Sequence, residues 1–138
     1  MSFLLDTNVV SELRKSHPNG NVRSWVESVR DADLHLSVLV VGELRQGIEL
    51  LRRRDAGQAD ALETWLATLE RAYGERIIPV TIRIADVWSR LNVPDRLPAI
   101  DGLLAATAKF HDLTLVTRNI DHVRRAGISA LNPFERQT

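Results

Sequence analysis

Four acidic residues stand beside apolar segments, where the fold alone has no need of a charge: Asp6, Glu43, Asp101 and Asp121. If folding gathers them, their mutual repulsion is large, because two carboxylates about 5 Å apart repel by roughly 3 kcal/mol at an effective dielectric constant near 20. Either some of them are protonated or a divalent cation neutralises them. Ligand sets made only of oxygen select Mg²⁺ or Mn²⁺ rather than zinc. The four acids therefore predict a metal site.

Asp6 follows the apolar run Phe3–Leu5 directly, and Thr7 and Asn8 come next. A purely structural strand has no reason to end in a carboxylate, a hydroxyl and an amide. In open parallel sheets, ligands bind beyond the carboxyl ends of the strands. Asp6 is therefore expected at a ligand-binding edge of the sheet.

Asp121 comes a few residues after a second apolar run at 114–117, and thus near the same kind of edge. An exposed acid in a turn is the alternative for this residue. Asn119 occupies a neighbouring position and could share or replace its role.

Asp101 shares one face of a predicted helix with Leu104, Ala105 and Ala108, at the spacing that places side chains on one side of a helix. A sheet should cover that face. The alternative is an acid that favours the first turn of the helix through the helix dipole.

Glu43 lies in the segment Val38–Leu44, which is apolar nearly all round and is therefore expected to be buried. A buried glutamate is almost always paired or bound to metal. The alternative is an ion pair with Arg45 or Arg14. Asp86, by contrast, lies opposite an apolar stripe and is expected to be exposed.

Carboxylates that hold a hard cation are suited to phosphate chemistry, because the metal can lower the pKa of water and clamp an in-line displacement at phosphorus. There is no Ser-His-Asp spacing and no Gly-x-x-x-x-Gly-Lys phosphate loop. A phosphatase with an aspartyl nucleophile would need a second acid where Asn8 stands. The four histidines show no metal-binding spacing. Metal-assisted phosphoryl hydrolysis is the chemistry that these residues favour.

Short apolar runs alternate with helical patterns, which predicts an α/β fold with a parallel sheet covered on both faces. Strands are expected at 3–5, 34–37, 76–80, 114–117 and 128–131. Helices are expected at 8–13, 61–73 and 99–110, with a turn or short helix at 119–125. Three further helices are expected to begin after capping residues: one after Asn21, one from 38 to about 53 after Ser37, and one after Thr81.

The length of 138 residues predicts one domain with a substantial core. The formal net charge is zero, so any nucleic-acid binding must come from local patches or from metal. The absence of cysteine excludes disulfides and thiolate chemistry and fits a cytoplasmic location. No apolar stretch approaches the length of a membrane span, so we expect no membrane association.

Four segments of the chain, in this order, resemble those of PIN-domain ribonucleases, and specifically of VapC-type toxins from toxin–antitoxin pairs. They cover most of the chain, and the four together are more specific than any one alone. They are Leu4–Glu12, Ser37–Gly47, Ile100–Ala108 and Leu115–Asn119.

The resemblance implies a three-layer α/β/α fold with a five-stranded parallel sheet, residues 1–138 forming a single PIN domain. It implies that Asp6, Glu43, Asp101 and Asp121 bind metal and serve catalysis. Thr7, Asn8, Thr117 and Asn119 match supporting polar positions. The fourth acid departs from the pattern, because some relatives carry aspartate where Asn119 stands, and His122 replaces an aromatic residue that often follows the acid.

The implied activity is Mg²⁺- or Mn²⁺-dependent hydrolysis of RNA phosphodiester bonds by metal-activated water, leaving a 5′-phosphate. Single-stranded or looped RNA fits an exposed edge site better than a duplex does. Similar proteins form homodimers and are held inactive by a VapB-type antitoxin, whose basic side chain can occupy the carboxylate pocket. The alternatives are a PIN-fold regulatory protein without catalysis and another metal-dependent phosphoryl hydrolase.

Overall fold

The strand that precedes Asp6 lies in the middle of a five-stranded parallel sheet. The computed structural model describes residues 1–137. Within them the strand order is β3-β2-β1-β4-β5, and every neighbouring pair runs parallel. The strands are β1 Phe3–Leu5, β2 Leu34–Ser37, β3 Ile77–Ile78, β4 Thr114–Val116 and β5 Ala130–Leu131. The predicted five-stranded parallel sheet is confirmed.

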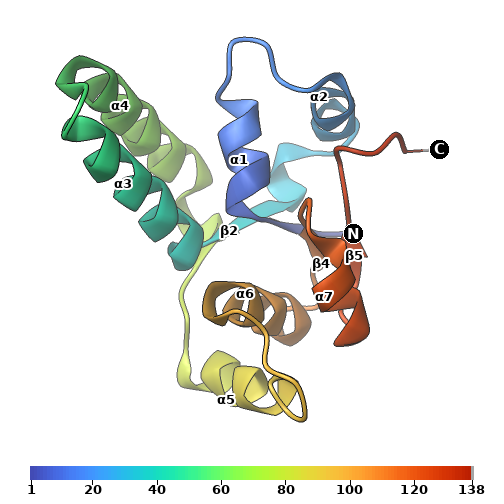
Figure 1. Ribbon diagram of the computed structural model, residues 1–138. Coiled ribbons are helices and arrows are strands. Elements are labelled where there is room, and N and C mark those ends of the chain that lie inside the picture. The colour runs from blue at the N-terminus through green and yellow to red at the C-terminus, as the bar shows by residue number, and fades with distance from the viewer. Residues whose placement is uncertain (138) are drawn as a thin grey trace.

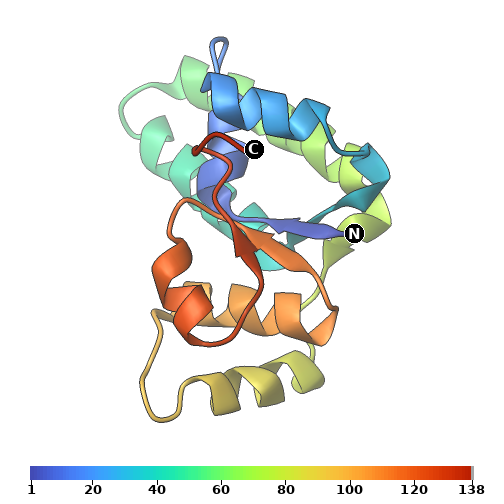
Figure 2. The same ribbon diagram turned by 90° about the vertical axis from the view of Figure 1, so that its right-hand side faces the viewer.

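Helices cover both faces of this sheet (Figures 1 and 2). On one face lie α1 Thr7–Leu13, α2 Gly20–Glu27, α3 Val38–Arg52 and α4 Ala56–Tyr73. On the other lie α5 Ile82–Leu91, α6 Ala99–Phe110 and α7 Ile120–Arg125. Short 3₁₀ turns at Asp31–Asp33 and Gly74–Arg76 lead into β2 and β3. The predicted three-layer α/β/α architecture is thereby confirmed.

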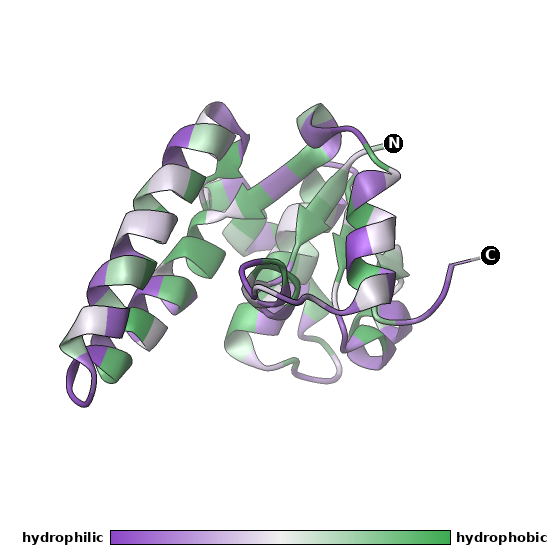
Figure 3. Cartoon of the chain, turned by 90° about the horizontal axis from the view of Figure 1, so that it is seen from above, coloured by the Kyte–Doolittle hydropathy of each residue, from purple (hydrophilic) through white to green (hydrophobic). Residues whose placement is uncertain are grey.

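The core forms where the central strands meet these helices. Leu4, Leu5 and Leu115 are fully buried or nearly so, and each such side chain contributes roughly 1.5–3 kcal/mol relative to an exposed one. Colouring by hydropathy shows hydrophobic residues along the central strands, whereas the helices alternate hydrophobic and hydrophilic positions (Figure 3). A densely packed sheet centre fixes the ends of β1 and β4, from which the candidate site extends.

Two helix starts are fixed by caps that the sequence predicts. The Ser37 hydroxyl accepts from the backbone N–H of Leu39 at 3.0 Å, and the Thr81 hydroxyl accepts from that of Ile84 at 3.3 Å. Each satisfies a backbone donor that the first turn of a helix leaves without a partner.

Some predicted boundaries are wrong. Asn19, rather than Asn21, caps α2, because the Asn19 side chain accepts from two backbone N–H groups of the first turn. Helix α4 begins at Ala56, five residues before the predicted start, because Asp55 caps it and its exposed first residues carry no apolar stripe. The strands predicted at 76–80 and 128–131 shrink to two residues each.

Helices α3 and α4 pack on each other as a hairpin that extends away from the sheet (Figure 1). Arg45 of α3 pairs with Glu63 and Glu70 of α4 across it, at 3.6 and 3.7 Å. Among residues 1–137, no helix is both long enough and apolar enough to cross a membrane.

Candidate active site

Asp6 is the most firmly held of the four predicted acids. It lies between the central strand β1 and helix α1, and the residue is only 9% exposed. The Oδ1 atom accepts from the backbone N–H of Thr7 at 2.7 Å. The Oδ2 atom accepts from the Thr117 hydroxyl at 2.7 Å and from the Asn8 side-chain amide at 3.5 Å. These donors fix the orientation of the carboxylate at the end of the sheet.

Thr117 connects two neighbouring strand ends. It follows β4, which pairs with β1, and it is 2% exposed. Its hydroxyl donates to Asp6 and accepts from the backbone N–H of Asn119 at 3.2 Å. The Asn8 side-chain carbonyl in turn accepts from the backbone N–H of Arg118 at 3.4 Å. The polar residues after β1 and after β4 therefore form one hydrogen-bonded network.

Glu43 joins this network from helix α3. Its Oε1 accepts from the Thr7 hydroxyl at 2.6 Å, so a single threonine contacts both Asp6 and Glu43. Within residues 1–137, no arginine, lysine or histidine lies within ion-pair distance of Glu43, and Arg45 instead pairs across the α3–α4 hairpin. The alternative of a buried ion pair is not what the structure contains.

The expectation that Glu43 is deeply buried is wrong. The glutamate is half-buried, Val38 is 41% exposed, and Gly42 is exposed. The reason is that only one face of α3, that of Val40, Leu44 and Ile48, is buried, so the rest of its apolar first turns is left partly open. The carboxylate is thus reachable from solvent while its oxygen is held by Thr7.

Asp101 approaches the same place from the opposite face of the sheet. It lies in the first turn of α6, half-buried, and the predicted face of Leu104, Ala105 and Ala108 is buried. Burial raises the pKa of the Asp101 carboxyl, and the negative charges of Asp6 and Glu43 raise it further. Acids from three separate elements therefore repel one another across a shared space.

Asp121 is exposed in the first turn of α7, next to the Asp101 side of the site. A cavity of about 480 Å³, the acid cavity, is lined by Asp101, Arg118, Asn119, Asp121 and His122, among others. His122 lies near enough to Asp101 to lower the pKa of that carboxyl, against the effect of the other acids. Asp121 and Asn119 both line this cavity, so either has access to it.

The Arg118 guanidinium, which also lines the acid cavity, is fixed by the C-terminal segment. The guanidinium stacks over the Phe134 ring, with its Cζ atom 3.7 Å from the ring centroid. The backbone carbonyl of Arg118 accepts from the Asn132 side-chain amide at 3.3 Å. One cation is thereby held at the rim of the acidic site.

The donor atoms of these residues are of the kind that binds a divalent cation. Carboxylates, hydroxyls and an amide are the oxygen donors that Mg²⁺ and Mn²⁺ prefer. Within residues 1–137, however, no three histidine, cysteine, aspartate or glutamate side chains are arranged as ready metal ligands. Ligation by three of the carboxylates at once therefore requires side-chain movement.

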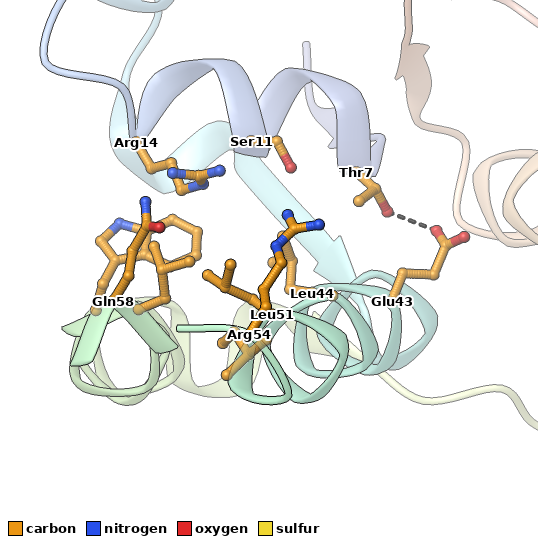
Figure 4. A pocket seen from close by; sticks show the side chains of 12 residues that line it. Thr7, Ser11, Arg14, Glu43, Leu44, Leu51, Arg54 and Gln58 are labelled. Atoms are coloured by element: carbon orange, nitrogen blue, oxygen red, sulfur yellow. Dashed lines mark hydrogen bonds between the residues drawn. The ribbon is translucent and has the colours of Figure 1, made fainter. Parts of the chain in front are cut away.

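A groove, which we call the hairpin groove, leads away from the Thr7–Glu43 contact between α1 and the α3–α4 hairpin (Figure 4). Its cavity measures about 290 Å³. Leu44, Leu51 and Trp65 are among the apolar residues that line it, whereas Arg14 and Arg54 contribute cationic groups. The sequence singles out Arg14 only as a possible ion-pair partner, because the approach of α1 to the hairpin is a tertiary feature.

Comparisons with known proteins agree with this geometry. Residues 3–128 match the family model of the PIN domain. The chain is 33% identical over 139 residues to the toxin FitB of Neisseria gonorrhoeae, covering 96% of this chain and 98% of that protein. It is 31% identical over 141 residues to a VapC ribonuclease of Sinorhizobium fredii, covering 96% and 98% respectively.

Solved structures give the same result. The crystal structure of FitAcB from Neisseria gonorrhoeae matches with a TM-score of 0.90 at 32% identity, covering 96% of this chain and 99% of that one. A structure of FitAB bound to an IR36 DNA fragment also matches with a TM-score of 0.90, at 30% identity, covering 99% and 98%. The chain therefore belongs to the PIN-domain family, among relatives that include the FitB toxin and VapC ribonucleases.

Proposed function

We propose that this chain is a metal-dependent endoribonuclease and the toxin of a toxin–antitoxin pair, acting as a single PIN domain. The observation that carries the proposal is the meeting of Asp6, Glu43 and Asp101 from three elements at one end of the sheet, in a chain of this family. The curated relatives include a protein named as a VapC ribonuclease. RNA is the proposed substrate, and the cytoplasm is the proposed location.

Asp6, Glu43 and Asp101 are the proposed holders of the cation, and Asp121 or Asn119 completes the set from the acid cavity. Mg²⁺ or Mn²⁺ is the proposed metal, because the donors are all oxygen. When bound, the cation would supply Lewis-acid activation of water and charge neutralisation at the phosphate. The pKa of Asp101 is raised by burial and by the charges of Asp6 and Glu43, and a cation bound between these acids would relieve that repulsion.

The polar neighbours of the acids have positioning roles in this proposal. Thr117 and Asn8 hold the Asp6 carboxylate, and Thr7 connects Asp6 with Glu43. Such supporting contacts keep ligands in a productive orientation, and their loss typically costs 10- to 100-fold in metal affinity or activity.

An antitoxin is the proposed partner. The hairpin groove is the surface that suits it best, because an apolar lining and two arginines can receive a mixed apolar and acidic segment. The groove ends at Glu43, so a segment bound there would also block access to the acids (Figure 4). A homodimer is the proposed assembly of the toxin itself, in line with the family.

A panel of substrates tests the reaction class. Purified protein is incubated with single-stranded RNA, single-stranded DNA of the same sequence and a phosphate monoester, with Mg²⁺, with Mn²⁺ and with EDTA. We expect cleavage of RNA only, with 5′-phosphate ends, and complete loss of cleavage in EDTA. Hydrolysis of the monoester or preferential cleavage of DNA would replace the proposal with another phosphoryl hydrolase. RNA cleavage that is unaffected by EDTA would contradict metal dependence.

A further inference from the structure

A neutral chain with an acidic site must obtain its attraction for RNA from local groups of cations. Two arginines of the α3–α4 hairpin are engaged by carboxylates: Arg52 contacts Glu49, Asp60 and Glu63, and Arg45 contacts Glu63 and Glu70. The cations that remain available near the acids are therefore the ones to examine.

One cavity next to the acids is rich in such cations. The basic cavity, as we call it, measures about 550 Å³ and lies between the end of α5, the 92–98 loop and α7. Arg90, Arg96, His122 and Arg125 line it, and Asp95 is the acid among its lining residues. With histidine neutral, the charged lining groups sum to a clear excess of positive charge.

Two of these arginines have no carboxylate partner. Arg90 is paired with Asp86 at 2.9 Å. Among the described residues, by contrast, neither Arg96 nor Arg125 has a carboxylate within 4.0 Å. Both are exposed, so their guanidinium groups are available to an anion from solvent. A guanidinium is well matched to phosphate, because its planar donors can bind two oxygens at once.

The basic cavity adjoins the candidate active site. His122 lines both the basic cavity and the acid cavity that holds Asp101 and Asp121. Arg125 follows His122 by three positions on α7, a spacing that places two side chains on the same side of a helix. The basic cavity is therefore the neighbour, on the His122 side, of a strand whose phosphate lies at the acids.

We propose that Arg96 and Arg125 bind a backbone phosphate of single-stranded RNA next to the bond that is cut, and so position the strand over the acids. This inference rests on the proposed ribonuclease function and adds to it the residues that hold the substrate. The exposed side chain of Val93 and the Pro94 ring provide apolar surface in the same cavity for the adjacent nucleoside. The hairpin groove has a more apolar lining and is assigned to the partner protein.

The test compares two double variants of equal charge change. Arg96→Ala with Arg125→Ala removes the proposed phosphate contacts. Arg23→Ala with Arg83→Ala removes two exposed arginines that line neither the hairpin groove nor the acid and basic cavities and have no carboxylate within 4.0 Å in residues 1–137. Binding of a fluorescent single-stranded RNA is measured in EDTA, so that no cleavage occurs, over a range of salt concentrations.

We expect the Arg96/Arg125 variant to bind RNA about 10- to 100-fold more weakly than the wild type. Loss of one or two phosphate contacts should also reduce the slope of log affinity against log salt by roughly 0.7 for each contact. The Arg23/Arg83 variant should change affinity less than about threefold, by loss of general charge. Arg96→Lys with Arg125→Lys keeps the charge and should recover most of the salt slope.

Steady-state cleavage separates this inference from the proposed function. In the presence of Mg²⁺, the Arg96/Arg125 variant should show a raised KM with kcat within a few-fold of the wild type. Unchanged RNA affinity, or an effect no larger than that of Arg23/Arg83, would overturn the phosphate-binding assignment even if the wild type cleaves RNA well. If the wild type binds RNA through Arg96 and Arg125 but never cleaves it, the assignment stands and the proposed catalysis fails.

Discussion

Asp101 is the residue at which burial and charge act most clearly against ionisation. Its pKa is raised by burial and by the charges of Asp6 and Glu43, partly offset by His122. An acid whose folded-state pKa lies above its unfolded value favours folding most while it is protonated. This contribution is lost as pH rises through the unfolded and then the folded pKa. The ionised site therefore reduces stability at neutral pH.

Asp101→Asn should for this reason be more stable than the wild type at pH 7 in EDTA. The gain should be below about 1 kcal/mol, because solvent screens a half-buried group. It should shrink as pH falls toward 3.8, the ordinary value for aspartate, where the wild-type carboxyl is itself protonated. Urea unfolding at pH 7 and at pH 4 measures the difference.

Asp86→Asn is the matched control for this stability measurement. Asp86 is exposed, as its position opposite the apolar stripe predicts, and its partner is Arg90. Its replacement should have little effect at either pH, because exposed ion pairs contribute little. A destabilised Asp101→Asn protein at pH 7 would show that the surroundings of the Asp101 carboxylate stabilise its charge, and would contradict net repulsion from Asp6 and Glu43.

At the scale of elements, the packing of α5 against α6 sets the position of Asp101. Gly102 follows Asp101 in α6, and a Cβ atom there would lie 3.1 Å from Trp88 Nε1 and 3.4 Å from Leu97 Cβ. The Trp88 indole N–H is buried without a hydrogen-bond partner among the described residues. The absence of a side chain at Gly102 thus permits the close approach of α5 beneath the first turn of α6.

Gly42→Ala and Gly102→Ala should therefore have opposite effects. Gly42 lies in α3, and a Cβ there meets nothing within 4 Å, so alanine should stabilise by up to about 1 kcal/mol through helix propensity. At Gly102 the same gain is outweighed by overpacking, which typically costs about 1–3 kcal/mol. Thermal or urea unfolding of both variants measures the change in the free energy of unfolding. Equal stabilisation by the two substitutions would show that α5 can move away from α6 without cost.

The elements that carry the acids could be predicted from the sequence, whereas the solvent exposure of Glu43 could not. Apolar runs locate β1, β2 and β4, and the position of Asp6 just after β1 indicates the functional edge. The half-buried state of Glu43 was not predictable, because it depends on which face of α3 its neighbours cover. The basic cavity was missed for a similar reason: Arg96 and Arg125 are far apart in the sequence, and only the fold brings them together.

At the scale of the whole molecule, opposite faces of the sheet contribute different parts of one site. Glu43 comes from the face covered by the α3–α4 hairpin, and Asp101 comes from the face covered by α5 and α6 (Figure 2). Asp6 and Thr117, at the ends of neighbouring strands, connect the two sides. The protein has no net charge overall, but an acidic centre and a basic cavity lie side by side in it. This arrangement suits a polyanion that is held next to the proposed metal site.

The most direct test of the central claim is the rate of single-stranded RNA cleavage as a function of Mg²⁺ or Mn²⁺ concentration for the wild type, Asp6→Asn and Asp86→Asn. Asp6→Asn keeps the size of the side chain but removes the charge at the centre of the network. We expect its cleavage rate to fall at least about 100-fold at every metal concentration, whereas Asp86→Asn should match the wild type. Cleavage by Asp6→Asn at the wild-type rate and with the same metal dependence would contradict the assignment of this carboxylate site as a metal-dependent ribonuclease centre.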